Sequence, residues 1–281
     1  MRPIDRYPHS LLGISHIAEQ AYCEQMVDLW LQNPGSLTSV PAIYEERLEE
    51  VPEARRQVDL AGGGTQFHES VSSAAAPASW DEIKEMLRSG HSLTMLESRL
   101  QGSYDSLALV GRPDAVCFDG WKARCILEYK VTESSRLYLN HRVQLLTYGY
   151  LLEQESFDVN DLILVCVFVP RRNKDWIGSL TERQAGKFLT TIRSEAEALL
   201  SKGISADLDW YHPGIRIRRG VEVKLRVIRY SRQEASRYLR LFADYWLGRR
   251  GPKPTTTKRK CQICLYNAAG LCATANAPYT G

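Results

Sequence analysis

LALVGRPDAVCFDGWKARCILEYKV, residues 107–131, is the most informative stretch of the chain. Two runs of strand-forming residues lie on either side of Asp119-Gly120, a dipeptide typical of tight turns, so the stretch predicts an antiparallel hairpin. A turn centred on Trp121 sets the register of the two strands. That register decides which side chains meet across the hairpin.

Two carboxylates and a lysine meet on the predicted hairpin. Asp114 faces Glu128 directly, and Lys130 shares the face of Glu128 because side chains alternate along a strand. Neighbouring anions repel each other unless a cation lies between them, and carboxylate oxygens suit Mg²⁺ or Mn²⁺. A lysine beside them can neutralise charge on a phosphate, as in metal-assisted phosphodiester hydrolysis. An ordinary salt bridge on a strand face is the alternative. Cys117 and Cys125 face each other on the opposite side.

The composition is that of a soluble globular protein. Of 281 residues, 44% are hydrophobic and 25% are charged, which excludes a disordered or fibrous chain. No apolar stretch approaches the roughly 20 residues of a membrane helix. Residues 1–20 contain Asp5 and Glu19 and fit neither a secretory signal nor a typical transit peptide. We therefore expect an intracellular protein that makes no membrane contact.

Positive charge is concentrated in residues 215–260. This segment contains 15 Lys and Arg against three acidic residues, a balance of +12, whereas the whole chain carries +3. The pattern predicts a polyanionic partner, although a solvated basic surface explains it equally well. Aromatic residues interleave with the cations, either to stack on the bases of a single strand or to form core: Tyr230, Tyr238, Phe242, Tyr245 and Trp246.

Hydrophobic periodicity predicts an alternation of helices and strands. Helical spacing is found at residues 15–31, 80–88, 142–153, 181–201 and 232–249. Strand patterns are found at residues 94–100, 106–118, 123–131, 162–169 and 221–230. The continuous apolar run at 162–169 is typical of a buried central strand. The order of these elements predicts an α/β fold with a mixed sheet.

Four of the seven cysteines are candidate metal ligands. Cys23 lies near the start of the chain, and Cys261, Cys264 and Cys272 follow a polar linker at residues 252–257. Because Cys-x-x-Cys with further cysteines binds soft metals through thiolates, a structural zinc ion and a [4Fe–4S] cluster both fit. The other three are predicted to be buried, reduced thiols in strand segments: Cys117, Cys125 and Cys166.

Gly111-Arg-Pro-Asp114, followed by Glu128-Tyr129-Lys130, resembles the Asp…Glu-x-Lys core of the restriction-endonuclease-like, or PD-(D/E)XK, nuclease superfamily. The strand–turn–strand placement of these residues is similar to that in the superfamily. The resemblance implies a mixed central sheet flanked by helices.

Two further elements resemble the RecB-type branch of that superfamily. Gly64-Thr-Gln-Phe-His68 is similar to its Gly-x-x-x-His element, whose histidine helps to hold a metal ion. Gln144-Leu-Leu-Thr-Tyr148 is similar to its Gln-x-x-x-Tyr element. Gln144 and Tyr148 are four residues apart, so they share one face of a helix.

The cysteine layout resembles that of the iron–sulfur nucleases of the RecB-type branch, with one cysteine before the nuclease core and three after it. Ala21-Tyr22-Cys23-Glu24 and the stretch from Tyr245 to Tyr266 are most similar to the exonuclease V family of single-strand DNA exonucleases. Seven residues separate Cys264 from Cys272, more than that family usually has.

This resemblance implies a role for each motif residue. Asp114 and Glu128 would bind Mg²⁺ or Mn²⁺, with the Tyr129 carbonyl and His68 completing the shell. Lys130 would position the nucleophilic water and stabilise charge in the transition state. The substrate strand would be seated by Gln144 and Tyr148. A structural [4Fe–4S] cluster would be held by four thiolates: Cys23, Cys261, Cys264 and Cys272.

The resemblance also implies how the chain is organised. Residues 1–281 would form a single iron–sulfur nuclease domain, with a catalytic core at 60–170 and a basic DNA-binding segment at 215–260. The cluster-binding tail at 261–281 would pair with the helix at 15–31.

The implied function is that of a monomeric exonuclease that hydrolyses single-stranded DNA from a free end in repair or genome maintenance. It would work with single-strand-binding protein, in the nucleus or mitochondrion of a eukaryote or the cytoplasm of a prokaryote. The alternatives are a CRISPR-associated RecB-type iron–sulfur nuclease, a non-catalytic, cluster-stapled nucleic-acid-binding module, and a zinc-stapled structural protein.

Overall fold

We analysed a computed structural model of the chain, which describes residues 11–32, 80–170, 172, 182–201, 210–218, 221–278 and 280. His68 and the motif that contains it lie outside the described residues, as do residues 60–79 of the predicted catalytic core.

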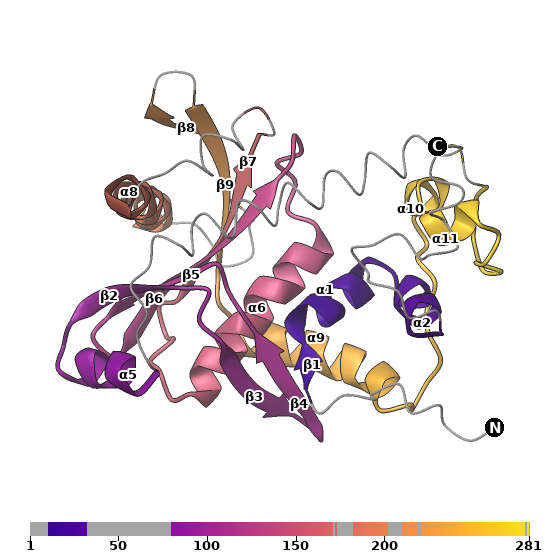
Figure 1. Ribbon diagram of the computed structural model, residues 1–281, viewed down its shortest axis with the longest axis horizontal. Helices are drawn as coiled ribbons and strands as arrows, with labels where there is room; N and C mark the ends of the chain where they lie inside the picture. Colours follow the sequence, from indigo (N-terminus) through magenta and orange to yellow (C-terminus); the bar gives the residue numbers. More distant parts are fainter. Residues whose placement is uncertain are drawn as a thin grey trace.

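A six-stranded mixed sheet forms the centre of the fold (Figure 1). β6 and β7 run parallel, and the other neighbouring strands of this sheet are antiparallel. All of β7 is buried, which confirms the expected central strand, and the α/β class with a mixed sheet is confirmed with it. The strands follow the order β2 (Ser92–Leu96), β5 (Ala115–Asp119), β6 (Lys122–Val131), β7 (Ile163–Val169), β9 (Val221–Arg229) and β8 (Trp210–Arg218).

The hairpin of β5 and β6 has the predicted register over most of its length. Ala115 pairs with Leu127, and Cys117 with Cys125 on the face opposite Glu128, as expected. A bulge after Cys117 shifts the register by one residue before the turn, where Asp119 pairs with Lys122. The turn thus spans Gly120 and Trp121, and Gly120 has a φ of +53°, a conformation that glycine adopts at little cost. The predicted pairing is wrong only beyond the bulge.

The single strand expected at residues 106–118 is wrong. It is two strands, β4 (Leu107–Gly111) and β5, which belong to different sheets. β4 lies between β1 (Leu12–Gly13) and β3 (Leu100–Tyr104) in a three-stranded sheet. At the end of β4 the backbone approaches α6 (Leu139–Gln154) so closely that a Cβ on Gly111 would lie 2.6 Å from Cε1 of Tyr148. Glycine is therefore required where the chain leaves one sheet for the other.

Helices cover both faces of the six-stranded sheet (Figure 1). α6 packs on one face together with α1 (Ile14–Tyr22) and α9 (Arg232–Trp246). α8 (Glu182–Ser201) packs on the other face. α5 (Trp80–Arg88) begins and ends where the sequence predicts a helix. Because side chains alternate along β6, Ile126 faces α6 and Leu127 faces α8.

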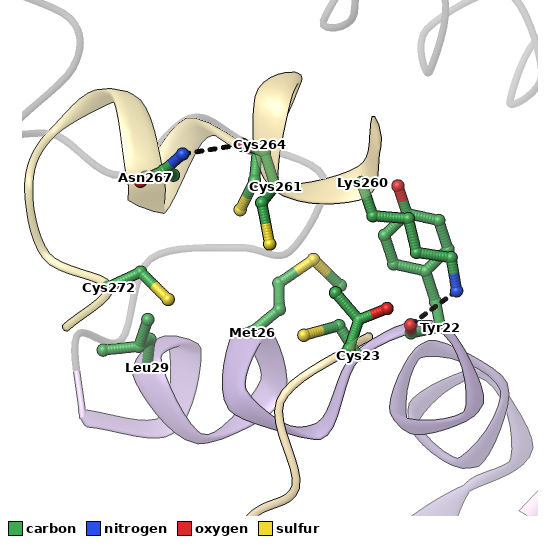
Figure 2. A pocket seen from close by; sticks show the side chains of 10 residues that line it. Tyr22, Cys23, Met26, Leu29, Lys260, Cys261, Cys264, Asn267 and Cys272 are labelled. Carbon is green, nitrogen blue, oxygen red and sulfur yellow. Dashed lines mark hydrogen bonds between the residues drawn. The ribbon is translucent and has the colours of Figure 1, made fainter. Parts of the chain in front are cut away.

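The expected helix at residues 15–31 is broken into two. α1 ends at Tyr22, α2 spans Glu24–Gln32, and between them Cys23 has an extended backbone with φ −163° and ψ 112°. The break turns the Cys23 side chain toward the C-terminal tail (Figure 2). A continuous helical pattern conceals it because both halves keep an apolar face.

The C-terminal tail returns to the N-terminal helices. Residues 252–257 form no helix or strand, as expected of a linker, and α10 (Lys258–Gln262) and α11 (Leu265–Ala268) follow them. Figure 1 shows these two short helices beside α2. Across the described ranges, no helix combines the length and apolar character needed to span a membrane.

Candidate functional site

Four side chains from β6 and α6 form one hydrogen-bonded group. The Nζ of Lys130 donates to Oε1 of Glu128 at 2.8 Å and to Oε1 of Gln144 at 3.1 Å. The Nε2 of Gln144 donates to the same Glu128 oxygen at 2.8 Å and to the hydroxyl of Tyr148 at 2.9 Å. The expected common faces of Glu128 with Lys130, and of Gln144 with Tyr148, are thus confirmed.

Asp114 joins this group from the connection before β5. Its Oδ2 accepts a hydrogen bond from the backbone N–H of Tyr129, in the strand that carries Glu128. The hydroxyl of Tyr148 donates to the carbonyl of Arg112 at 3.2 Å, which ties the connection to α6. Asp114 and Glu128 are both buried, with 5% and 3% of their surfaces exposed. The structure thus brings together every predicted catalytic residue that it describes.

Lys130 is the cation of the group, and its charge offsets that of one of the two carboxylates. Burial is the largest single effect on Lys130 and lowers its pKa. The charge and hydrogen bond of Glu128, together with the charges of Cys166 and Asp114, outweigh burial, so the pKa of Lys130 is raised above the usual range. Burial also raises the pKa of Tyr148, and the Glu128 charge adds to the effect. At neutral pH Lys130 is therefore a cation, and Tyr148 keeps its proton and can donate it in a hydrogen bond.

The donor set fits a hard divalent cation. Two buried carboxylates lie at one end of the hairpin, and carboxylate oxygens are the ligands that Mg²⁺ and Mn²⁺ prefer. They supply only part of a coordination shell, because within the described parts of the chain no three His, Cys, Asp or Glu side chains are grouped as ligands of one metal ion. Backbone carbonyls and water are the ligands that Mg²⁺ commonly adds to one or two carboxylates.

The geometry agrees with a comparison against protein families. Residues 18–269 match the profile of the PD-(D/E)XK nuclease superfamily. The chain belongs to this superfamily. Its members are nucleases, hydrolases that bind nucleic acid and typically use Mg²⁺ or Mn²⁺.

The chain was also compared with solved structures and with curated proteins. A solved structure titled "Crystal structure of SSO0001" is similar over 95% of this chain and 87% of that chain, with 14% sequence identity and a TM-score of 0.45. No curated protein matches the sequence of this chain.

A second group of interest is a pocket between α2 and the tail of the nuclease. All four candidate ligand cysteines line it, and Figure 2 shows their sulfur atoms pointing into a common space. Burial raises the pKa of Cys264. The charges of Cys23 and Cys272 raise it further, which shows that these side chains are close enough to influence one another. All seven cysteines of the chain are free thiols, and the three predicted to be core residues are buried.

Lys260 lies at the edge of the cysteine pocket. Its Nζ donates to the carbonyl of Tyr22 at 2.8 Å and lies 4.2 Å from the centre of the Tyr22 ring (Figure 2). Burial lowers the pKa of Lys260, and the nearby Cys23 opposes this effect.

A buried polar network joins the two ends of the chain beside this pocket. The Glu24 carboxylate accepts hydrogen bonds from Gln20 at 2.9 Å, from Arg250 at 2.5 and 2.6 Å, and from the backbone N–H of Lys253 at 2.7 Å. Gln20 in turn accepts a hydrogen bond from the indole of Trp246 at 2.7 Å. We call the Gln20, Glu24, Arg250 and Lys253 contacts the end latch.

We expect Arg250→Ala to lower the free energy of unfolding by about 3–5 kcal/mol, because it leaves a buried carboxylate without its charge partner. Glu24 is only 7% exposed and Arg250 19%. Urea unfolding followed by circular dichroism measures the loss. The matched control is Arg259→Ala, an exposed arginine in the same tail that should change stability by no more than about 0.5 kcal/mol. Equal losses in both variants would contradict the role of the end latch.

The basic segment is partly committed to internal contacts. Arg249 binds Asp105 at 2.7 Å, and Arg250 belongs to the end latch. Of the aromatic residues in this segment, Phe242, Tyr245 and Trp246 are buried, so the interpretation as core is confirmed for these three. Several cations stay exposed and face solvent: Arg232, Arg237, Arg240, Lys253, Lys258 and Arg259.

His141 of α6 is a further residue near the site that was not predicted from the sequence. It lies three residues before Gln144 and seven before Tyr148, on the same face of α6, a spacing that could have revealed it. Its ring lies 6.1 Å from that of Phe168, the residue of β7 that pairs with Lys130. Burial, assisted by the Lys130 charge, lowers the pKa of His141 to about 3, so the ring is neutral at physiological pH.

Proposed function

We propose that this nuclease is a metal-dependent exonuclease that hydrolyses single-stranded DNA from a free end, in DNA repair or genome maintenance. The observation that carries the proposal is the buried group of Asp114, Glu128 and Lys130, bound to Gln144 and Tyr148 of α6. In a surface salt bridge the carboxylates would stay exposed to water, whereas Asp114 and Glu128 are both buried. Burying two carboxylates costs desolvation free energy, which a bound cation would offset.

Each residue of the group has a part in the proposed reaction. Asp114 and Glu128 would hold the divalent cation together with the Tyr129 carbonyl and His68, and the cation would supply Lewis acidity and lower the pKa of water. Lys130, already protonated, would neutralise the charge that develops on the scissile phosphate. The Gln144 amide fixes one oxygen of Glu128, and it would seat the substrate strand together with the Tyr148 hydroxyl.

The proposal includes a structural [4Fe–4S] cluster in the cysteine pocket. Its support is that Cys23, from one end of the chain, and Cys261, Cys264 and Cys272, from the other, all line the same pocket. Four thiols are the donors that such a cluster takes, and in the described residues they share one pocket without being grouped as ligands of one metal ion. The end latch joins the same two segments of the chain. We therefore assign the cluster a structural role, in which it would shape the path of the single DNA strand, and not a role in electron transfer.

Cleavage of matched linear and circular single strands tests the proposal. The purified protein is incubated with Mg²⁺ and end-labelled linear DNA, with a circle of the same sequence alongside, and EDTA should stop all cleavage. We expect the linear strand to be degraded and the circle to stay intact, because a free end must be threaded. Cutting of both would contradict the exonuclease and favour an open endonuclease groove. If neither is cut, the chain is a binding module and the proposed function is wrong.

A further inference from the structure

The loop between β6 and α6 presents an exposed aromatic ring next to the proposed catalytic strand. Tyr138 is 43% exposed and Leu139 is 45% exposed, although both are large and apolar. They follow Lys130 by eight and nine residues, and Tyr138 is the residue that caps the start of α6. Only Met86 and Leu241 are comparably exposed among the large apolar side chains that the structure describes.

A row of rings connects Tyr138 to the site. The Tyr138 and His141 rings are 5.7 Å apart and meet edge to face, and His141 lies 6.1 Å from Phe168. Phe168 pairs with Lys130 across the parallel strands β6 and β7, so their side chains share one face of the sheet. Because His141 is neutral, the row carries no charge of its own between the exposed ring and Lys130.

The loop holds this ring in place from several sides. The hydroxyl groups of Tyr138 and Ser134 are 3.3 Å apart, and the N–H of Arg136 donates to the Ser134 hydroxyl at 3.3 Å. Arg226 of β9 donates to the carbonyl of Ser135 at 2.8 Å. The guanidinium of Arg136 lies 5.6 Å from the centre of the Tyr138 ring. A ring that is fixed, exposed and next to a cation is well suited to receive a planar ligand with a phosphate attached.

We propose that Tyr138 is a stacking platform for one unpaired nucleobase of the substrate DNA, in the strand whose scissile phosphate would lie at Lys130. Arg136 would assist by neutralising phosphate charge beside that base. The proposal rests on the proposed function and adds a base-binding subsite to it. Nucleobases offer a free face only when the strand is single, so the platform would favour single-stranded over double-stranded substrate. Every base has such a face, so the subsite would not select a sequence.

A binding cycle between protein and DNA variants tests the platform. Labelled oligonucleotides, each with one abasic position at a different distance from the end, are titrated in EDTA and followed by fluorescence anisotropy. For the unaltered protein, one position should stand out, where the missing base weakens binding by about tenfold. Tyr138→Ala should weaken binding of the intact strand by a similar factor and show no further loss at that position. Tyr138→Trp should restore both the affinity and the position-dependent penalty.

Two controls separate stacking from other effects. Met86→Ala removes an equally exposed apolar side chain on α5 and should bind like the unaltered protein. Tyr138→Ala should keep the dependence of the binding constant on salt, whereas Arg136→Ala should reduce its slope, because only the arginine neutralises phosphate charge. Thermal unfolding confirms that each variant is folded.

The outcomes distinguish this proposal from the proposed function. If the protein cleaves linear single strands but the abasic penalty is the same in Tyr138→Ala, the platform is wrong and the exonuclease stands. If the protein neither binds nor cleaves single strands, both are wrong. A penalty that disappears in Tyr138→Ala and returns in Tyr138→Trp supports the platform.

Discussion

Lys130→Ala should reduce the rate of DNA cleavage by at least about 10²- to 10³-fold, the usual loss when one group that stabilises transition-state charge is removed. The Nζ of Lys130 is the cationic donor to Glu128 within the group, and its raised pKa keeps it charged. The basic segment at 215–260, which would hold the phosphate backbone, is unchanged in this variant, so binding of a single strand in EDTA should change little. Gel-based cleavage rates and anisotropy measure the two effects separately.

Lys122→Ala is the matched control for that variant. It removes a lysine from the same strand, but one whose ion pair with Asp161 is exposed to solvent. Pairs of this kind contribute about 0–1 kcal/mol to stability, and Lys122 lies far along the strand from Glu128. Its turnover should be that of the unaltered protein. Unchanged turnover in Lys130→Ala would contradict the catalytic site.

Cys261→Ser should remove the visible absorbance at about 400 nm, the usual iron–sulfur band. The variant should also fail to fold into a soluble protein. Cys261 is buried in the cysteine pocket, where a cluster would fasten the tail to α2. Absorbance spectra, iron and sulfide analysis and size-exclusion chromatography measure these effects together.

Cys166→Ala is the control for the cysteine pocket. Cys166 is a buried thiol of β7 outside the pocket, so its removal should leave the colour intact. A colourless unaltered protein that contains stoichiometric zinc would contradict the iron–sulfur assignment. The same result would leave the nuclease site untouched, because Lys130→Ala tests that site independently.

More of the candidate site than of the surrounding fold could be predicted from the sequence. Alternation along a strand and the four-residue spacing on a helix are local rules, so they placed Lys130 beside Glu128 and Gln144 beside Tyr148 without knowledge of distant contacts. The bulge after Cys117 escaped the same reasoning because nothing in the local pattern marks it.

The errors occur where distant parts of the chain decide the local structure. Residues 106–118 have one continuous strand pattern, and the division after Gly111 depends on α6, which approaches the backbone there. The break at Cys23 likewise precedes Glu24, whose partner Arg250 is 226 residues away. Sequence periodicity carries no information about either contact, so both were missed.

The end latch has a consequence for the order of events during synthesis. Cys23 and Glu24 leave the ribosome long before Arg250 and the other three cysteines, because Arg250 follows Glu24 by 226 residues. Contacts between such distant residues close late, since the chain between them must be ordered first. The cysteine pocket therefore cannot exist before Cys272 has left the ribosome. Any cofactor of the pocket must enter after that point, and until Arg250 has been made the helix pair of α1 and α2 stays unlatched.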